Sequence, residues 1–355
     1  MSALRILVDV AHPHHVHMFR NLVHRVRAEG GDAVVAARDK DVTLDLCRAH
    51  DLPWVRVSGP WPGGALGLAG ELLLRTLRIA GLTRRFRPHA LVGTSLSVGP
   101  VGHLTRRPSF VFSEDDSHIV PLFSRLAYPF CHYVVTPAAL AHEAHGRRHL
   151  TYRGYQELAY LHPAHFEPDR RALRDLGIDP ERPHFVLRLV ALRGHHDTAA
   201  RGLPLEATRE LVRRLALRGR VLITSEAVLR PEFEPYRFSL PAERLHDVLA
   251  TAALYVGDSQ TMAVEAAVLG VPGIRCNSFV GRISVLEELE HRYGLTRGIL
   301  PEDSKLLLAT VDEWLARGGE LRREWQQRRA RMLEECVDLS EWQWRTLQER
   351  VAPGS

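Results

Sequence analysis

Residues 4–36 read LRILVDVAHPHHVHMFRNLVHRVRAEGGDAVVA, and this stretch decides the fold. It begins with a short apolar run, which is typical of a buried parallel strand. A polar turn rich in histidine follows, and apolar residues then recur at helical spacing over 18–26. The pair Gly30-Gly31 ends this predicted helix, and the apolar run at 32–36 predicts a second strand. The stretch therefore predicts one strand–helix–strand unit of a parallel sheet.

The same alternation continues along the rest of the chain. Apolar runs predict further strands, and the segments between them predict helices. Strands that alternate with helices indicate parallel sheets covered on both faces. Further strands are expected at residues 53–57, 90–92, 109–112, 132–136, 185–189, 221–224, 254–256 and 273–275, with helices at 42–50, 66–82, 208–217, 244–251 and 259–269 among them.

The predicted strands fall into two series, which indicates two doubly wound, Rossmann-like α/β domains that face each other across a cleft. The first domain is expected to span residues 1–153 and the second residues 154–338. A helical region rich in Trp and Arg ends the chain, and its last part is expected at residues 339–355.

The composition is that of an ordinary globular chain. The 355 residues include 47 Lys and Arg against 42 Asp and Glu, a net charge of +5. This mild excess allows acidic ligands such as phosphates. The sequence has no basic stripe with interleaved aromatic residues, so it does not indicate a nucleic-acid partner. The four cysteines lie far apart and form no CxxC pair, which argues against a zinc finger and a disulfide scaffold and favours a cytoplasmic location.

No apolar stretch is long enough to span a membrane, and the N-terminus does not have the pattern of a signal peptide. The nearest candidate, residues 63–82, is interrupted by Glu71, Arg75 and Arg78. The flanking Trp61 and the arginines also fit a helix that lies on a membrane surface. We interpret the segment as a helix that covers the sheet, because the alternation requires one there. Peripheral contact with a membrane stays open.

Ligands of open α/β sheets bind at the carboxyl ends of the strands, so the loops after the strands carry the candidate site. The most specific loop is GDSQTMAVEAAVL at 257–269. Ser259 is a natural N-cap, and the free N–H groups of the helix start, with Gln260, suit a phosphate. Thr261 and Glu265 share one helical face, where the Glu265 carboxylate suits the hydroxyls of a ribose. The alternative is an ordinary capped helix with a solvent-facing glutamate.

Three further groups of polar residues follow predicted strands. A histidine in the first loop suits a general base; surface histidines and a metal site are the alternatives, and without an acidic partner at ligand spacing we predict no metal. The second group is acidic and suits an acceptor site or a base, or forms a surface turn. The third group is mostly basic and suits a leaving diphosphate, or lies in a solvated loop. The groups are Asp9, His12, His14, His15 and His17; Glu114, Asp115 and Asp116; and Arg188, Arg193, His195, His196 and Asp197.

Three blocks of the sequence resemble one family. They are DVAHPHHVHMF from Asp9, RGYQELAYLHPAHFEPD from Arg153 and GDSQTMAVEAAVLGVPGIRCNSFVG from Gly257. The family is catalogued as domain of unknown function 354, and the resemblance runs over nearly the whole chain. The family is similar to a remote branch of the GT-B superfamily, which includes the lipid II N-acetylglucosaminyltransferase and the non-hydrolysing UDP-N-acetylglucosamine 2-epimerase.

This resemblance implies a GT-B-like fold that binds a nucleotide-diphosphate sugar and requires no metal or cofactor. It also implies that the C-terminal helix crosses back to the first domain. Glu265 falls on the position that grips the ribose in these relatives, and Ser259 and Thr261 fall on their phosphate loop, although Gln260 replaces a common glycine. His15 is the nearest match to the suspected base of the lipid II transferase, but the glycines of that loop are absent.

We therefore predict a metal-independent glycosyltransferase that moves a sugar from a UDP-linked donor to the hydroxyl of a glycan or glycolipid acceptor. His15, or failing that Asp115 or Asp116, is expected to deprotonate the acceptor. The helix that starts at Ser259, together with Arg188, Arg193 or His195, is expected to stabilise the departing diphosphate.

Two alternatives remain open. One is a sugar-nucleotide 2-epimerase or hydrolase that uses Glu114 with His195 or His196. Epimerase chemistry is disfavoured because one of its acidic positions, after the strand at 90–92, reads Gly93-Thr94-Ser95 and has no carboxylate. The other is a module that binds a nucleotide-sugar without turnover.

Overall fold

The chain folds into two compact units. The first joins Met1–His165 to the C-terminal segment Cys336–Ser355, and the second is Phe166–Glu335. Each unit contains one parallel sheet with helices on both faces, so the protein is of the α/β class. The computed structural model describes residues 3–61, 64–143, 145–190, 202–225 and 228–351.

A seven-stranded parallel sheet forms the centre of the first unit, with the order β3-β2-β1-β4-β5-β6-β7. β1 pairs with β2 and with β4, so that Val8 lies opposite both Val35 and Val92. The strands are β1 (Arg5–Val10), β2 (Asp32–Arg38), β3 (Trp54–Ser58), β4 (Ala90–Gly93), β5 (Ser109–Phe112), β6 (Tyr133–Pro137) and β7 (His149–Tyr152).

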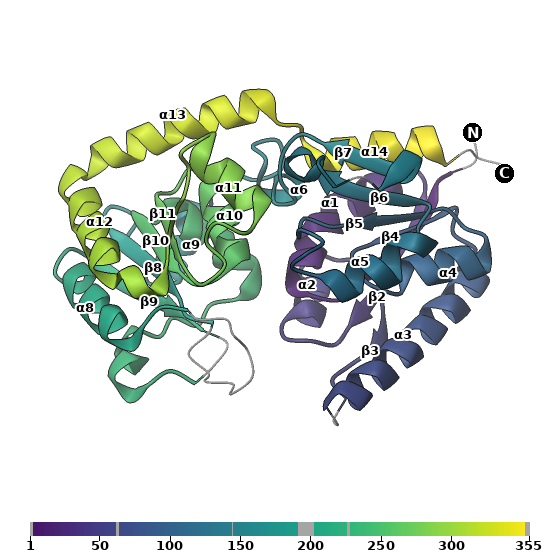
Figure 1. Ribbon diagram of the computed structural model, residues 1–355, viewed down its shortest axis with the longest axis horizontal. Helices are drawn as coiled ribbons and strands as arrows, with labels where there is room; N and C mark the ends of the chain where they lie inside the picture. The colour runs from purple at the N-terminus through teal and green to yellow at the C-terminus, as the bar shows by residue number, and fades with distance from the viewer. Residues whose placement is uncertain (1–2, 62–63, 144, 191–201, 226–227, 352–355) are drawn as a thin grey trace. The chain divides into compact units, whose positions relative to one another are not determined.

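Helices cover both faces of this sheet (Figure 1). The strand order runs outward from β1 to β3 in one direction and from β4 to β7 in the other. Right-handed crossovers therefore place α1 and α2 on one face and α3, α4 and α5 on the other. The packing agrees, because α1 contacts α2, α6 and α14 while α4 contacts α3 and α5. The helices are α1 (Pro13–Ala28), α2 (Thr43–Ala49), α3 (Gly64–Phe86), α4 (Val98–Thr105), α5 (Pro121–Ala127), α6 (Leu158–Leu161) and α14 (Leu339–Arg350), with 3-10 turns η1 (Tyr128–Phe130), η2 (Ala138–Leu140) and η3 (Gly146–Arg148).

The core of the first unit lies between the sheet and these helices. Leu7, Val92 and Val111 of the sheet and Met18 and Leu22 of α1 are completely buried. Both faces of the central strands are covered, which explains why their sequences are continuous apolar runs and do not alternate.

The expected domain boundary between residues 153 and 154 falls inside the first unit, which continues to His165. The reason is α6, which packs against α1 and is anchored by a hydrogen bond from Asn21 Nδ2 to the carbonyl of Ala159 at 2.7 Å. The chain rejoins this unit beyond residue 335, where the N–H of Val337 donates to the carbonyl of Arg153 at 2.9 Å. The last helix, α14, then packs on α1 and α6.

The second unit contains a five-stranded parallel sheet with the order β12-β11-β10-β8-β9. The long α13 is fixed to its own unit by Trp325, whose Nε1 donates to the carbonyl of Leu295 at 2.9 Å. The strands are β8 (His184–Arg188), β9 (Arg220–Thr224), β10 (Leu254–Gly257), β11 (Gly273–Cys276) and β12 (Arg297–Ile299). The helices are α7 (Arg170–Asp175), α8 (Leu205–Ala216), α9 (Leu245–Thr251), α10 (Gln260–Val268), α11 (Ser284–His291), α12 (Ser304–Arg317) and α13 (Gly319–Glu335), with 3-10 turns η4 (Pro231–Tyr236), η5 (Ala242–Arg244) and η6 (Pro301–Asp303).

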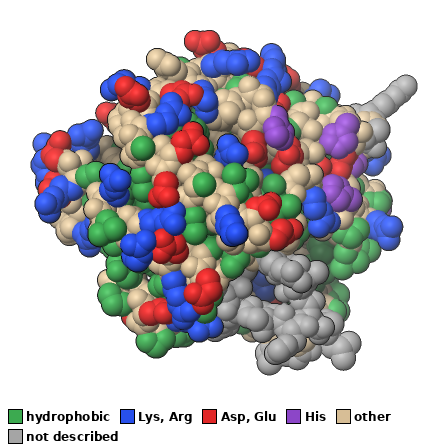
Figure 2. Space-filling view, turned by 60° about the vertical axis from the view of Figure 1, so that its left-hand side comes forward, with side chains coloured by type: hydrophobic (Ala, Val, Ile, Leu, Met, Phe, Trp, Pro, Cys, Tyr) green, Lys and Arg blue, Asp and Glu red, His purple; other side chains and the backbone are tan. Residues whose placement is uncertain are grey.

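Within the described part of the chain, no helix has the length and apolar character needed to cross a membrane. On the face drawn in Figure 2, basic and acidic side chains are mixed, and neither sign covers a large area alone.

Candidate functional site

In the second unit, the loop between β10 and α10 has the geometry of an anion-binding turn. Ser259 is the N-cap of α10, and its Oγ accepts a hydrogen bond from the N–H of Met262 at 3.3 Å. Ser259, Gln260 and Thr261 are all half-buried and therefore partly accessible. The first amide groups of a helix point outward with a partial positive charge, which suits a phosphate at this position.

Glu265 lies one turn further along α10, and only 4% of it is exposed. His246 of α9 holds the carboxylate, with 3.0 Å between its Nε2 and Glu265 Oε1. The alternative interpretation of a solvent-facing glutamate is therefore wrong. His246 was missed by sequence reasoning, because its partner lies in a different helix 19 positions away.

Asp258 ties the neighbouring loops together at the carboxyl edge of this sheet. Its Oδ1 accepts from the N–H of Val190, after β8, at 2.7 Å, and its carbonyl accepts from Asn277 Nδ2, after β11, at 3.0 Å. Arg188 is the last residue of β8 and is half-buried at the same edge. Three loops thus converge around Ser259. The predicted diphosphate ligands Arg193 and His195, and their neighbours at 196 and 197, lie outside the described residues.

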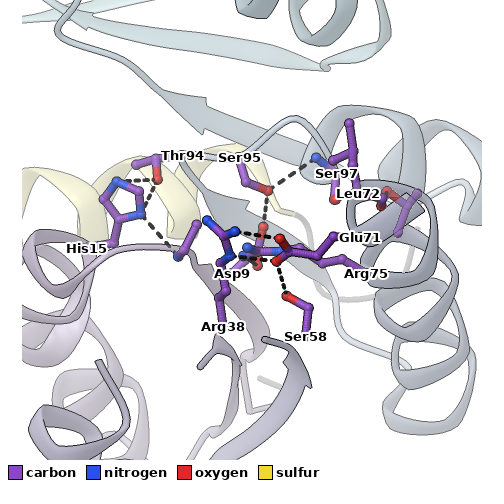
Figure 3. A network of polar contacts seen from close by, with 12 residues as sticks. Asp9, His15, Arg38, Ser58, Glu71, Leu72, Arg75, Thr94, Ser95 and Ser97 are labelled. Carbon is purple, nitrogen blue, oxygen red and sulfur yellow. Dashed lines mark hydrogen bonds and ion pairs between the residues drawn. The ribbon is translucent and has the colours of Figure 1, made fainter. Parts of the chain in front are cut away.

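In the first unit, Asp9 is engaged in a buried ion pair and does not line an open loop. It lies in β1, is completely buried, and pairs with Arg75 of α3 while it accepts a hydrogen bond from Ser95 Oγ (Figure 3). A ligand can reach the Asp9 carboxylate only if this pair opens. Burial of such a pair is favourable only when both partners are satisfied, which makes Asp9 and Arg75 mutually dependent.

A second charged pair on the same helix fastens α3 to the ends of β2 and β3. Arg38 Nε donates to Glu71 Oε1 at 2.6 Å, and Ser58 Oγ donates to the same oxygen at 3.1 Å (Figure 3). Glu71 and Arg75 are four residues apart, so one face of α3 contacts the carboxyl ends of three neighbouring strands. Sequence reasoning took these two charges only as interruptions of an apolar run.

His15 has a ring that is neutral at physiological pH. Its pKa is held well below the ordinary value, first by burial and then by the neighbouring His14 and His12. The N–H of Ala11 donates to His15 Nδ1 at 3.2 Å, and Thr94 Oγ1 lies 2.6 Å from Nδ1 and 2.9 Å from Nε2 (Figure 3). Because the lone pair of Nδ1 accepts from a backbone N–H, we assign the proton of the neutral ring to Nε2. This tautomer suits a hydrogen-bond donor better than a proton acceptor.

The neighbouring histidines have local structural partners. His12 is the N-cap of α1 and accepts from the N–H of His14 at 3.4 Å. His17 is buried and stacks on the ring of Tyr160 with 5.3 Å between centroids, and its Nδ1 lies 3.2 Å from Arg20 Nη1. The stacking of His17 on Tyr160 joins α1 to α6.

His14 is the centre of a buried polar cluster that the sequence did not predict. Its Nδ1 lies 3.2 Å from Tyr160 Oη, and its Nε2 lies 3.2 Å from Gln156 Oε1 and 4.0 Å from Glu114 Oε1. One ligand atom each from His14, Glu114 and Glu157 lies within 4.8 Å of the others, which is close enough for a metal ion. The histidine loop therefore does have acidic partners, but they come from segments more than 90 residues away in sequence, Glu114 following β5 and Glu157 preceding α6.

The remaining acidic residues after β5 differ in their exposure. Asp115 is exposed, and its pKa is raised by the protein around its carboxyl group and by the charge of Asp116. Asp116 is buried, and one oxygen lies 4.0 Å from His142 Nε2. Asp116, His142 and Glu143 form a second group with the geometry to hold a metal. Glu143 already accepts two hydrogen bonds of 2.6 Å from Ser117.

The fold is similar to that of a UDP-N-acetylglucosamine 2-epimerase and of several glycosyltransferases. A UDP-N-acetylglucosamine 2-epimerase is similar over 100% of this chain and 99% of its own, with a TM-score of 0.67 and 13% identity. The glycotransferase of kitacinnamycin is similar over 99% of this chain and 100% of its own, with a TM-score of 0.64 and 14% identity. The calicheamicin glycosyltransferase CalG4 covers the same shares, with a TM-score of 0.60 and 14% identity. These similarities show a GT-B-like fold.

The sequence itself has a relative in Methanocaldococcus jannaschii, an uncharacterized protein that is 23% identical over 298 residues, 78% of this chain and 82% of the relative. The model of one family, described as protein of unknown function (DUF354), matches residues 4–285, and the chain belongs to this family.

Proposed function

We propose that the protein is a GT-B-type glycosyltransferase that moves a sugar from a UDP-linked donor to an acceptor hydroxyl without a metal ion. The observation that carries this proposal is the Ser259-capped start of α10, with the buried Glu265 one turn behind it. A diphosphate at the helix start and a ribose on Glu265 fit this spacing. The GT-B-like fold supports the same chemistry.

The donor half of the reaction falls to the second unit. The amide groups at the start of α10 and the guanidinium of Arg188 stabilise the charge that develops on the departing diphosphate, which is the role a divalent cation fills elsewhere. His246 holds the Glu265 carboxylate, with 3.0 Å between its Nε2 and Glu265 Oε1, and a ribose hydroxyl donates to this carboxylate.

The acceptor half falls to the loops after β1, β4 and β5 in the first unit. Asp115 is the better candidate for the base, because it is exposed and because its pKa is raised above the ordinary value toward neutral pH. His15 donates a hydrogen bond through Nε2 and does not abstract the proton. This assignment differs from the sequence-based expectation, which put His15 first.

The first experiment is calorimetry with UDP, GDP, ADP, CMP and dTDP, each with and without magnesium. We expect UDP to bind with the same affinity in both conditions. Glu265→Gln should weaken UDP binding about 5- to 150-fold, as the loss of a charged hydrogen bond of roughly 1–3 kcal/mol requires. Glu313→Gln, an exposed glutamate on α12 of the same unit, is the matched control and should bind as the unmodified protein does. Unchanged binding by Glu265→Gln would remove the ribose assignment.

A second candidate function is a sugar-nucleotide 2-epimerase or hydrolase, favoured by the cluster in which Glu114, after β5, lies close to His14 and Glu157. Against it, Thr94 and Ser95 after β4 supply hydroxyls where a carboxylate is needed. Incubation with a UDP-sugar alone separates the two functions, because only the alternative produces an epimerised sugar or free UDP without an acceptor. Tight UDP binding with no turnover under any condition would indicate a binding module.

A further inference from the structure

One segment of the first unit has an extreme charge distribution. Between Glu71 and Glu114 the sequence contains seven arginines and no Asp or Glu, although the net charge of the whole chain is only +5. Residues 117–142 also lack acidic side chains and include Arg125. These segments supply most of α3 and all of α4, α5 and η1.

The same elements expose large apolar side chains. Leu73 and Leu77, one turn apart on α3, are 62% and 61% exposed. Leu104 at the end of α4 is 67% exposed, Leu122 on α5 is 66% exposed, and Phe130 of η1 is 44% exposed. Single exposed leucines are ordinary, but exposed apolar residues gathered on adjacent elements mark an interaction surface.

These side chains lie on one face of the first unit. α3, α4 and α5 cover the same face of the sheet, where α4 packs against α3, α5 and η1 (Figure 1). Glu71, Arg75 and Ile79 turn the opposite side of α3 toward the sheet and are buried, which leaves Leu73 and Leu77 outward. We call this surface, with its exposed arginines 78, 84, 85, 106 and 125, the α3–α5 face.

The arginines of the α3–α5 face lie in segments without acidic side chains, since residues 72–113 and 117–142 contain no Asp or Glu. Arg84, Arg85, Arg106 and Arg125 form no ion pair with any described residue. In the second unit some exposed arginines pair with glutamates, as in Arg209–Glu232, Arg213–Glu210 and Arg292–Glu335, while others, such as Arg218 and Arg282, form no ion pair with a described residue. Cations without counter-charges of their own are available to an external anion.

We propose that the α3–α5 face docks on an anionic lipid surface, with Leu73, Leu77 and their apolar neighbours at the boundary between headgroups and acyl chains and the arginines against lipid phosphates. This pairing of an apolar stripe with cations is what binds a protein to a membrane interface. A second copy of the chain fits less well, because a two-fold contact through this face would bring arginines toward arginines with no acidic group to offset them.

The docking face adjoins the candidate site through α3. The helix starts after the carboxyl end of β3, and its inner side chains Glu71 and Arg75 bind Arg38 and Asp9 at the strand ends (Figure 3). Resting on the proposed function, the acceptor is then a hydroxyl carried by a membrane lipid. The docking itself requires no nucleotide, so vesicle binding and UDP binding fail or succeed independently.

The test is co-sedimentation of the full chain with vesicles of phosphatidylcholine alone and of equal parts phosphatidylcholine and phosphatidylglycerol. We expect binding to the mixed vesicles that weakens as salt is raised, and little binding to the neutral ones. The double variant Leu77→Glu with Arg84→Glu should weaken binding more than about tenfold, since each basic residue at such a surface contributes roughly fivefold.

The matched control is Leu217→Glu with Arg218→Glu, an exposed leucine–arginine pair in the second unit. It should bind vesicles as the unmodified protein does, and both double variants should keep the thermal stability of the parent. Absence of binding to mixed vesicles, or equal loss in both double variants, would overturn the proposal. So would a dimer in solution that only the α3 variant dissociates, because that result would assign the face to a second copy of the chain.

Discussion

The side chain of His15 illustrates how one backbone contact decides the chemistry of a residue. The Ala11 N–H occupies Nδ1, so protonation of the ring would break that hydrogen bond, and the pKa lies well below its ordinary value mainly because of burial. A carboxylate with a raised pKa, Asp115, is free of this restriction. The two residues therefore differ in the pH dependence that their loss should cause.

Asp115→Asn is expected to lower the turnover number roughly 10²–10⁴-fold and to remove the acid limb of its pH profile. A base must be ionised to work, so the rate of the unmodified protein should fall as the pH drops through the raised pKa of Asp115. The measurement is UDP release from a UDP-sugar in the presence of a simple alcohol acceptor. His15→Ala should slow the reaction but keep the acid limb; a limb that disappears with His15 would return the base role to that residue.

Gly257 lies in a closely packed part of the turn between β10 and α10. An added Cβ would lie 2.6 Å from Tyr255 Oη and 2.8 Å from the carbonyl of Arg188. Gly257→Ala should therefore lower the free energy of unfolding by roughly 1–3 kcal/mol, measured by urea denaturation. Gly81→Ala is the control, because nothing lies within 4 Å of its added Cβ in a helix and alanine favours helix. Equal stability of both variants would contradict this account of the β10–α10 turn.

At this scale the sequence predicted the local geometry of the β10–α10 turn, with Ser259 as the N-cap. Thr261 and Glu265 are four residues apart, so helical spacing alone places them on one face of α10. The partners His246 of Glu265 and Glu157 of His14 could not be predicted, because only the strand order and the packing of α6 bring these distant segments into contact. A single sequence contains no signal for such pairs.

Among the secondary-structure elements, most of the apolar strands and the helices α1, α2, α3, α8, α9 and α10 were predicted, whereas α4, α5, α7, α11 and α12 were not. The reason is clearest for α4. Its sequence, VGPVGHLT, contains two glycines and a proline, which are poor helix formers. Tertiary contacts override this preference: an added Cβ at Gly102 would lie 2.6 Å from Ser109 Cβ, so the glycine permits close contact with the next strand. β7 and β12 were missed because they are short edge strands without a distinct apolar run.

The C-terminal helix α14 depends on its cap. Asp338 Oδ1 accepts from the N–H groups of Ser340 at 3.0 Å and Glu341 at 3.3 Å, and Oδ2 lies 2.8 Å from His165 Nε2. Asp338→Ala should lower the free energy of unfolding by about 1–2 kcal/mol, since it removes both the cap and the pair with His165. Asp338→Asn retains a capping oxygen and should lose less. Urea denaturation of the two variants measures the difference, and equal losses would show that the charge rather than the cap fixes α14.

For the whole molecule, the alternation of strands and helices was sufficient to predict two parallel α/β sheets. It was not sufficient to place the boundary between the units, because α6 and the segment after residue 335 belong to the first unit through packing on α1 and through one backbone hydrogen bond. Both are tertiary contacts between remote parts of the chain. The α3–α5 face also emerged only when the fold showed which leucines point outward.

Histidine burial in both units predicts how the stability of the whole molecule responds to pH. Burial lowers the pKa of His15, His132 and His149 in the first unit and of His184 in the second. Below a pH of about 6.5 the unfolded chain takes up protons that these folded rings resist, so the free energy of unfolding should fall as the pH drops from 7 to 5. The raised pKa values of Asp115 and Glu290 act in the opposite direction, but only at the lower end of this window, where carboxylates begin to protonate.

Urea denaturation from pH 7 to pH 5 should show a steady decrease in the free energy of unfolding. His184→Gln should reduce the slope by at most about 1.4 kcal/mol per pH unit, since one group contributes one proton. A stability that stays constant or rises from pH 7 to pH 5 would mean that the folded rings are protonated as readily as the unfolded ones.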